Sequence, residues 1–280
     1  MDLHLGTCLE AVRRRRPLIV CITNFVTVND CANALLAVGA SPVMTDSPQD
    51  AGDLLSCADG LYLNIGTVTA SSAELMVHAA RWAKQREIPV LLDPVGAGAS
   101  EIRTKTAEEL LISGNIGFLR GNISEIRALT GKSSTIRGVD VGAEDDKGAM
   151  FDANSALAAE LAKRYSICVG VSGPVDRVAS GRRLVLVENG DPLLPRICGT
   201  GCVLSAVSAA FAAAAPQDPF EAFTAAFALC GLAGERARAL LGPSCGPAAM
   251  RTAFLDSLFA IRGEDLDRGA RLRRQGEDNQ

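Results

Sequence analysis

The chain has 280 residues, of which 48% are hydrophobic and 21% are charged, and its formal net charge at pH 7 is −4. This is the composition of a globular protein with enough apolar material for a buried core, and it excludes a largely disordered chain. Acidic and basic residues are interspersed, and beyond nine Phe the aromatic residues are two Tyr and one Trp. We therefore expect no nucleic-acid partner and no surface for stacking bases.

The sequence indicates a cytoplasmic protein. Its longest apolar helix start, residues 202–215, is too short and too rich in serine to span a bilayer, and no signal-peptide pattern is present. The nine cysteines form no C-x-x-C pair, which is typical of buried thiols in a reducing compartment and not of disulfides or a zinc site. The run RRRRP at residues 13–17 permits a localisation or polyanion-binding role, but we favour a solvated face.

The first elements alternate between strand and helix patterns. PLIVCIT, at residues 17–23, is a continuous apolar run that predicts a strand covered on both faces. The next run predicts a helix that Thr27 can cap and Gly39 can close. Its apolar stripe consists of Val28, Cys31, Leu35 and Val38.

The same alternation continues as far as residue 122. Further strands are predicted at SPVMT, GLYLNIG, IPVLLDPVG and GFLRGN, with helices over residues 73–86 and 106–112 between them. This order predicts a mostly parallel sheet with helices on both faces, a three-layer αβα fold. We expect a single domain over residues 1–280.

The second half of the chain changes character. Residues 132–147 are polar and indicate a loop or flap. A helix over residues 152–164, a strand at ICVGVSG and a hairpin turning at Ser180 and Gly181 are expected next. The remaining helices are predicted at residues 201–214, 219–241 and 248–261, and the charged residues 263–280 are expected to form a flexible tail.

Polar residues end most of the predicted strands. Ligands of open parallel sheets bind beyond the carboxyl ends of the strands, so these residues are candidates for one shared site, although Gly and Pro after a strand are turn residues first. They are Thr23, Asn24, Met44, Asp46, Asn64, Gly66, Asp93, Arg120, Gly121, Asn122, Ser172 and Gly173.

The motif CGTGC at residues 198–202 opens a long apolar helix. A helix start preceded by glycines presents unpaired N–H groups and the positive end of the helix dipole, which suits a phosphate or a developing anion. It is neither a Walker A loop nor a G-x-G-x-x-G fingerprint. Taken alone, the motif is equally compatible with a structural turn.

Five stretches together resemble one family. They are CITNFVTVNDCANALLAVGASPVMTDSP, LYLNIGTV, PVLLDPVGAGAS, FLRGNISEIRAL and GTGCVLSAVSAAF, in order between about residues 17 and 259. The chain resembles the hydroxyethylthiazole kinases, a thiamine-salvage family of ribokinase-like enzymes. The resemblance implies Mg²⁺-dependent transfer of phosphate from ATP to the primary alcohol of 4-methyl-5-(2-hydroxyethyl)thiazole. It also implies a homotrimer with active sites between subunits.

The resemblance further implies roles for individual residues. The thiazole alcohol would contact Asn24, Met44, Gly66 and Gly199. ATP would contact Arg120, Asn122 and Ser172, and the metal would be served by Asp93 and Glu125, directly or through water. The catalytic position would be Cys202, with Gly199, Thr200 and Gly201 forming the turn before it.

Two departures and one structural alternative qualify these assignments. Ser172 stands where the family commonly has Thr, although the hydroxyl is kept, and residues 132–147 offer no firm match. Glu125 lies in the first turn of a helix that follows Asn122, where a carboxylate also serves as a cap without any metal.

Cys202 takes the place that related sugar kinases give to an aspartate base. We expect the helix dipole to lower the pKa of its thiol, so that it can accept a proton from the alcohol. General-base help is worth roughly 10²–10⁴-fold, and loose phosphoryl-transfer transition states need little of it. A covalent role would need a histidine partner, and the chain has only His4 and His78.

Two other functions stay open from sequence alone. One is a different ribokinase-like enzyme, such as a pyrimidine-alcohol or sugar kinase or an ATP-dependent dehydratase of hydrated nicotinamide nucleotides, which would carry aspartate in place of Cys202. The other is a ligand-binding or regulatory module without catalysis, against which the retained Asp93, Arg120 and Glu125 argue.

Overall fold

The computed structural model describes residues 3–131 and 147–274. One nine-stranded sheet runs through it in the order β2-β1-β3-β4-β5-β6-β7-β8-β9. Neighbouring strands from β2 to β6 pair in parallel, and β6 to β9 pair antiparallel. The strands are β1 (Leu18–Ile22), β2 (Ser41–Met44), β3 (Gly60–Asn64), β4 (Val90–Asp93), β5 (Phe118–Asn122), β6 (Cys168–Ser172), β7 (Asp176–Ser180), β8 (Arg183–Val187) and β9 (Leu272–Arg274).

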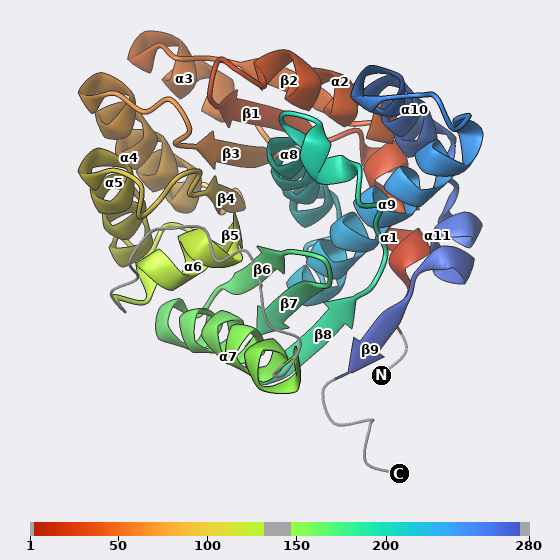
Figure 1. Ribbon diagram of the computed structural model, residues 1–280. Coiled ribbons are helices and arrows are strands. Elements are labelled where there is room, and N and C mark those ends of the chain that lie inside the picture. Colours follow the sequence, from red (N-terminus) through yellow and green to blue (C-terminus); the bar gives the residue numbers. More distant parts are fainter. Residues whose placement is uncertain (1–2, 132–146, 275–280) are drawn as a thin grey trace.

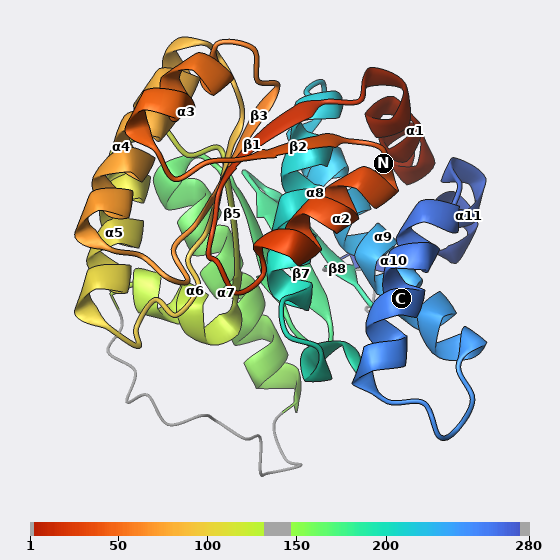
Figure 2. The same ribbon diagram turned by 90° about the horizontal axis from the view of Figure 1, so that it is seen from above.

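Helices cover both faces of this sheet, as Figure 1 and Figure 2 show. One layer consists of α3 (Pro48–Leu55), α4 (Ala70–Gln85), α5 (Glu101–Ile112), α6 (Ile123–Leu129) and α7 (Lys147–Tyr165). The other consists of α1 (Leu5–Arg15), α2 (Val28–Val38), α8 (Thr200–Ala214), α9 (Pro219–Leu240), α10 (Pro247–Ala260) and α11 (Gly263–Gly269), with a short 3₁₀ turn at Leu194–Arg196. The expected three-layer αβα fold is confirmed.

Helix α8 is the central element of its layer. It is buried along almost its whole length and packs on β3 and β4 and against α1, α2 and α9. Seven of its residues are Ala or Gly, and small side chains allow helices and sheet to approach closely. Because α8 packs against the sheet on one side and against three helices on its other sides, its first turn is held in a fixed position over the sheet.

Most predicted elements are present, but their capping differs at one point. Gly39 closes α2 with φ of +96°, as expected for a left-handed C-terminal residue. Thr27 does occupy the N-cap position of α2, but its side chain makes no capping hydrogen bond. The hydroxyl instead donates to the side chain of Asn24, at 3.1 Å. Thr27 is therefore oriented toward the end of β1.

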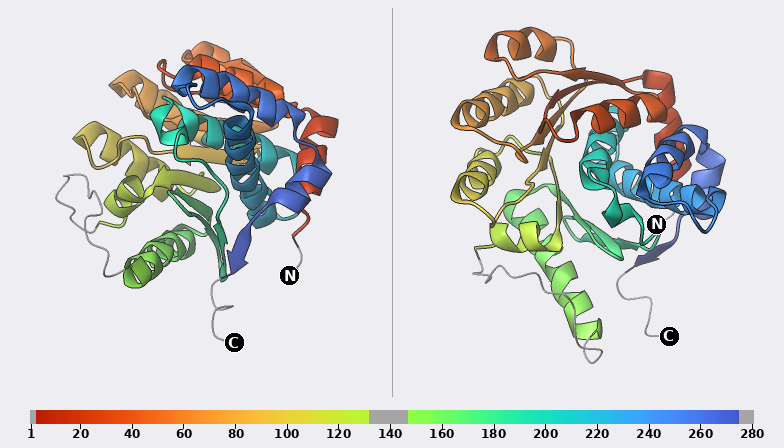
Figure 3. Two further views of the ribbon diagram at one scale, coloured as in Figure 1. Left: turned by 45° about the vertical axis from the view of Figure 1, so that its right-hand side comes forward. Right: turned by 45° about the horizontal axis from the view of Figure 1, so that its top comes forward.

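The expectation of a flexible tail from residue 263 is wrong for residues 263–274. These residues form α11 and β9, and β9 pairs with β8 at the sheet edge (Figure 3). Leu266 is fully buried, and Arg271 forms an ion pair with Glu235 at 2.6 Å. The charged side chains of this segment form specific ion pairs with the rest of the protein, such as that of Arg271 with Glu235. Residues 275–280 lie outside the described residues, as do residues 132–146 of the expected flap.

The arginine run and the cysteines largely follow expectation. Arg13 donates to the carbonyl oxygen of Ile261 at 2.6 Å, whereas Arg14, Arg15 and Arg16 are exposed. All nine cysteines are free, and six of them are buried. Across the described part of the chain, no helix has the length and apolar character needed to cross a membrane.

Candidate active site

The carboxyl ends of the parallel strands place the expected polar residues on one rim. Asn64 at the end of β3 lies opposite Asp93 at the end of β4, and Asn122 lies opposite Ser172 on β5 and β6. Asn24 lies two residues after the end of β1. The first turn of α8 lies against this rim, because Cys202 contacts both Asn24 and Asn64. The structure therefore brings most of the predicted site together.

Asp93 is fully buried at the centre of this rim. Its Oδ2 atom accepts hydrogen bonds from Ser205 Oγ at 2.8 Å, Asn64 Nδ2 at 3.1 Å and Tyr62 Oη at 3.4 Å. Its Oδ1 atom has no partner among the described residues. Burial raises the pKa of Asp93 to about 6, while the positive charge of Arg120 acts in the opposite direction. The carboxylate thus keeps one unsatisfied oxygen in a buried position.

Arg120 lies between Asp93 and the first turn of α8. Its Nη1 atom lies 3.8 Å from Asp93 Oδ2, and its Nη2 atom donates to Ser172 Oγ. A Cβ atom added at Gly201 would lie 2.7 Å from Nη1. The guanidinium therefore occupies the space that a larger residue in the first turn of α8 would fill. Its Nε atom is buried and has no hydrogen-bond partner in the described structure.

The first turn of α8 is shaped by Gly199. This residue is the N-cap and has φ of +92°, a left-handed conformation that favours glycine. The first intrahelical bond of the turn joins Val203 N to Gly199 O at 2.8 Å. The preceding N–H groups, of Thr200, Gly201 and Cys202, have no intrahelical acceptor. They form the expected amide cradle.

Two asparagine side chains line the rim beside this cradle. Asn24 Nδ2 donates to Asn64 Oδ1 at 3.0 Å and to Cys202 Sγ at 3.5 Å. Asn64 Nδ2 donates to the same sulfur at 3.3 Å, and Gly66 N donates to Asn64 Oδ1 at 2.9 Å. Asn24, Gly66 and Cys202 are thus connected through Asn64, a rim residue for which the resemblance implies no role.

Cys202 is the third residue of α8, and it is 8% exposed. Burial and the negative charge of Asp93 raise the pKa of its thiol, in that order, and hydrogen bonds from Thr27, Asn64 and Asn24 only partly oppose this. The expectation of a lowered pKa is therefore wrong. The helix dipole acts on Cys202, but desolvation and a neighbouring carboxylate act more strongly.

Glu125 and Asn122 form a capping box at the start of α6. Glu125 N donates to Asn122 Oδ1 at 3.0 Å, and Asn122 N donates to Glu125 Oε2 at 2.8 Å. The other carboxylate oxygen, Oε1, accepts from Gly96 N at 2.9 Å. Both oxygens of Glu125 therefore hold backbone groups, and the capping role anticipated as an alternative is present.

The polar residues of the rim offer few ligands to a magnesium ion. No group of three or more His, Cys, Asp or Glu side chains within residues 3–131 and 147–274 is arranged to hold a metal. One carboxylate fits nonetheless, because the orphaned Oδ1 of Asp93 is a buried oxygen without a donor. Mg²⁺ commonly binds through one or two carboxylates and keeps several waters. Asp93 suits direct binding, and Glu125 suits contact through water.

Met44 and the residues after Asn24 complete the rim. Met44 ends β2, is half-buried and packs against the apolar core that contains Cys202. Phe25 and Val26 follow Asn24 and are 78% and 59% exposed. Large apolar side chains at this exposure next to a polar site are suited to contact with another molecule.

Three polar residues at the centre were not predicted from the sequence, namely Tyr62, Ser205 and Thr27 as a hydrogen-bonding group. Two of them had a detectable signal. Tyr62 lies two residues before Asn64 on the same strand and hence on the same face. Ser205 lies one helical turn after Cys202.

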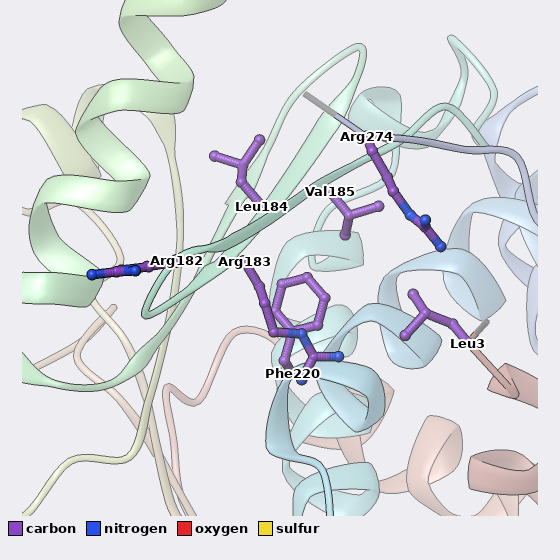
Figure 4. A pocket seen from close by; sticks show the side chains of 7 residues that line it. All are labelled: Leu3, Arg182, Arg183, Leu184, Val185, Phe220 and Arg274. Carbon is purple, nitrogen blue, oxygen red and sulfur yellow. The ribbon is translucent and has the colours of Figure 1, made fainter. Parts of the chain in front are cut away.

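A separate cavity of about 250 Å³ lies at the opposite edge of the sheet (Figure 4). It lies beside the start of β8, which follows the end of the antiparallel strand β7 and so lies away from the carboxyl tips of the parallel strands. Its central Arg183 is paired with Asp218 at 2.8 Å and stacks on Phe220. This cavity takes no part in the site described above.

Comparison with known proteins decides the family. The sequence model of the hydroxyethylthiazole kinase family matches residues 9–264. The chain belongs to the hydroxyethylthiazole kinase family. It is 40% identical over 264 residues to the hydroxyethylthiazole kinase of Thermoanaerobacter pseudethanolicus, covering 94% of this chain and 97% of that protein.

Solved structures agree with this membership. The hydroxyethylthiazole kinase of Pyrococcus horikoshii OT3 superposes with a TM-score of 0.85 at 36% identity, over 96% of this chain and 98% of that one. A ribokinase-like superfamily protein of Enterococcus faecalis superposes with a TM-score of 0.60 at 14% identity, over 90% and 93% of the two chains. The latter supports the ribokinase-like fold alone. As a member of the hydroxyethylthiazole kinase family, the protein is a kinase.

Proposed function

We propose that this kinase transfers the terminal phosphate of ATP to the primary alcohol of 4-methyl-5-(2-hydroxyethyl)thiazole, in thiamine biosynthesis or salvage. The observation that carries the proposal is the position of the α8 cradle. It lies between Arg120, which can neutralise phosphate, and the paired amides of Asn24 and Asn64, which can hold a small polar heterocycle. Phosphoryl transfer depends mainly on such alignment and neutralisation.

The alcohol substrate is assigned to the β1 and β3 side of the rim. Asn24, Met44 and Gly66 would line the thiazole pocket, and Gly199 would contact the substrate at the edge of the turn. The pairing of Asn24 with Asn64 supports this assignment, because it fixes the direction of both amides before any ligand binds.

The nucleotide is assigned to the β5 and β6 side. Arg120 and Ser172 are already hydrogen-bonded to each other, and Asn122 lies opposite Ser172. Together they present a guanidinium, a hydroxyl and an amide to one region. The unpaired N–H groups of Thr200, Gly201 and Cys202 would face the charge that develops on the transferring phosphate.

Mg²⁺ is proposed to bind next to Asp93. The ion would neutralise phosphate charge and help to align the reacting oxygens. Asp93 would hold it through its free Oδ1 atom, and Glu125 would contact its water shell while continuing to cap α6. Arg120, at 3.8 Å from Asp93 Oδ2, would limit the negative charge that accumulates at this end of the rim.

Cys202 is proposed to act as a weak general base. Its raised pKa leaves little thiolate at neutral pH, so its contribution would be small compared with that of an ordinary catalytic base. The cradle and Arg120 would supply most of the rate enhancement. A weak base suffices because the attacking alcohol loses its proton late in a loose transition state.

A cytoplasmic homotrimer with sites between subunits is part of the same proposal. The exposed Phe25 and Val26 support it, because they flank Asn24 and would become buried if a second subunit covered the rim. Size-exclusion chromatography with light scattering measures the assembly state. A monomer at micromolar concentration would contradict the trimer.

A coupled assay of ATP consumption across small alcohols tests the function. We expect turnover with the thiazole alcohol and Mg²⁺, and much slower turnover with hydroxymethylpyrimidine. Preference for the pyrimidine or for a sugar would favour another ribokinase-like kinase. If none of these alcohols promotes ATP consumption, the result would favour a binding module.

A further inference from the structure

Helix α8 carries two buried serines one turn apart, which differ in a single contact. Ser205 and Ser208 are both fully buried. Ser205 Oγ donates to Asp93 Oδ2 at 2.8 Å, whereas Ser208 Oγ has no partner within residues 3–131 and 147–274. The two residues share helix, side chain and burial, so the bond to Asp93 is what distinguishes Ser205.

The direction of the Ser205 hydroxyl is not dictated by its own helix. A serine or threonine inside a helix can donate to the carbonyl oxygen four residues earlier. Thr224 on α9, which is also fully buried, does this, with its Oγ1 atom 2.8 Å from Phe220 O. Ser205 instead reaches across to the end of β4. Because neither α8 nor β4 is formed by this bond, its effect is to join the two elements.

The bond from Ser205 completes a set of three donors on one oxygen of Asp93. Asn64 Nδ2 at 3.1 Å and Tyr62 Oη at 3.4 Å come from β3, the strand next to β4, and Ser205 adds the shortest contact from α8. A carboxylate oxygen offers about two lone-pair sites, so Oδ2 is saturated. A further ligand of Asp93 is therefore left to Oδ1, which has no partner among the described residues.

Ser205 makes this contact close to the amide cradle. It follows Cys202, the last residue of the cradle, by three positions and hence by about one helical turn. On the same side of α8, Tyr62 Oη donates to Cys202 O at 3.2 Å. Because a helix is a rigid element, a bond at Ser205 also sets how far the cradle lies from Asp93.

From these contacts we infer that Ser205 is a positioning residue for phosphoryl transfer. It ties Asp93 to α8, so that the amide cradle and the free Oδ1 atom of Asp93 keep one fixed separation. Phosphoryl transfer depends mainly on such alignment of the groups around the phosphate. The kinetic consequence rests on the proposed function, whereas the link between α8 and β4 rests on the geometry alone.

The two serines provide a matched pair of variants. Ser205→Ala removes the shortest donor of Asp93, and we expect it to lower kcat roughly tenfold, as for loss of a hydrogen bond to a charged group. The KM for ATP should stay within about twofold of its original value, because Arg120 and Ser172 keep their hydrogen bond to each other. Ser208→Ala removes a hydroxyl that has no partner in the described structure, so kcat and KM should not change. Alanine suits a helix interior, so both variants should fold.

Urea unfolding without nucleotide or metal measures the link to Asp93 directly. Ser205→Ala and Ser208→Ala would each be made in the original chain and in an Asp93→Ala background. We expect Ser205→Ala to lower the unfolding midpoint of the original chain. In the Asp93→Ala background it should have little effect, because the hydroxyl has already lost its acceptor. Ser208→Ala should act equally in both backgrounds.

Equal kcat values for Ser205→Ala and Ser208→Ala would overturn the positioning role. A raised KM for ATP at unchanged kcat would overturn it too, because Ser205 would then act on nucleotide binding. If Ser205→Ala lowers the unfolding midpoint equally in both backgrounds, the serine acts by packing alone and the link to Asp93 is refuted. If the wild-type protein does not phosphorylate the thiazole alcohol, the proposed function fails, and the urea comparison still decides whether Ser205 holds Asp93.

Discussion

Gly201 and Arg120 share one space at the start of α8. A Cβ atom at position 201 would lie 2.7 Å from Arg120 Nη1, closer than two such atoms approach in proteins. Because Nη1 also faces Asp93 at 3.8 Å, displacing the guanidinium would disturb the acidic centre as well. A larger residue at position 201 would therefore have to shift the end of the Arg120 side chain.

Gly201→Ala is accordingly expected to impair the kinase without unfolding it. Alanine favours the helical state by about 1 kcal/mol over glycine, so α8 should persist. The KM for ATP should rise or kcat fall by roughly tenfold, because Arg120 is pushed from its position. Steady-state kinetics with a melting curve measure both effects. Gly242→Ala is the control, because a Cβ there meets nothing within 4 Å. Equal kinetics in the two variants would contradict the packing argument.

Asp93 should give the protein a characteristic pH dependence. Its pKa of about 6 lies above the ordinary value for aspartate, so the folded protein keeps a proton that the unfolded chain has lost. The contribution of Asp93 to the free energy of unfolding therefore falls as the pH rises from about 4 to about 6, and it is constant above that range. Urea unfolding from pH 4 to 8 measures it against Asp93→Asn, which should lack this slope. Parallel curves would show that Asp93 titrates normally.

The proposed role of Cys202 as a general base can be tested by substituting its side chain. Cys202→Asp should keep or raise turnover, because a carboxylate is ionised where the buried thiol is not. Cys202→Ala should lower kcat by roughly tenfold and leave ATP binding intact, since the cradle and Arg120 remain. Kinetics and calorimetric ATP titration give the two quantities. Complete loss of activity in a folded Cys202→Asp variant would count against the base role.

Glu125→Gln should affect stability and magnesium use together. The amide cannot accept at both ends, so one of the backbone bonds from Asn122 or Gly96 is lost, at a cost of about 1 kcal/mol in unfolding free energy. The Mg²⁺ concentration needed for half-maximal activity should rise, because one negative charge is removed near the proposed ion.

The control for that experiment is Glu101→Gln. Glu101 lies in the first turn of α5 and is exposed, and within the described part of the chain its one ion pair is with Lys105 at the surface. The substitution changes net charge by the same amount, and we expect neither stability nor Mg²⁺ dependence to move. If both variants shift the Mg²⁺ dependence equally, Glu125 acts through net charge and has no specific role at the site.

Local pattern was enough to predict which polar residues gather on one rim of the sheet. The apolar runs that end at Asn64, Asp93 and Ser172 predicted parallel strands, and parallel strands bring their carboxyl ends to one edge. The glycines before Cys202 predicted a helix start. These signals are contained in a few consecutive residues, so no knowledge of distant contacts was needed.

The predictions that were wrong concern properties that depend on residues far away in the sequence. The pKa of Cys202 depends on Asp93, which lies 109 positions earlier in the chain, and the helix dipole alone gave the wrong direction. The segment from residue 263 looked unstructured by composition, but Glu235 pairs with Arg271 and β8 pairs with β9. Helix α1 was missed because its apolar residues contact α8 and α9 and its arginines dominate the local pattern.

The most direct test of the account is product identification. Wild-type protein and Arg120→Ala would be incubated with ATP, Mg²⁺ and the thiazole alcohol, and the products analysed by mass spectrometry. The proposed function predicts thiazole monophosphate and ADP in equal amounts from the wild type, and at least about tenfold less of both from Arg120→Ala. ATP left intact by a folded wild-type protein, or equal product from the variant, would contradict it.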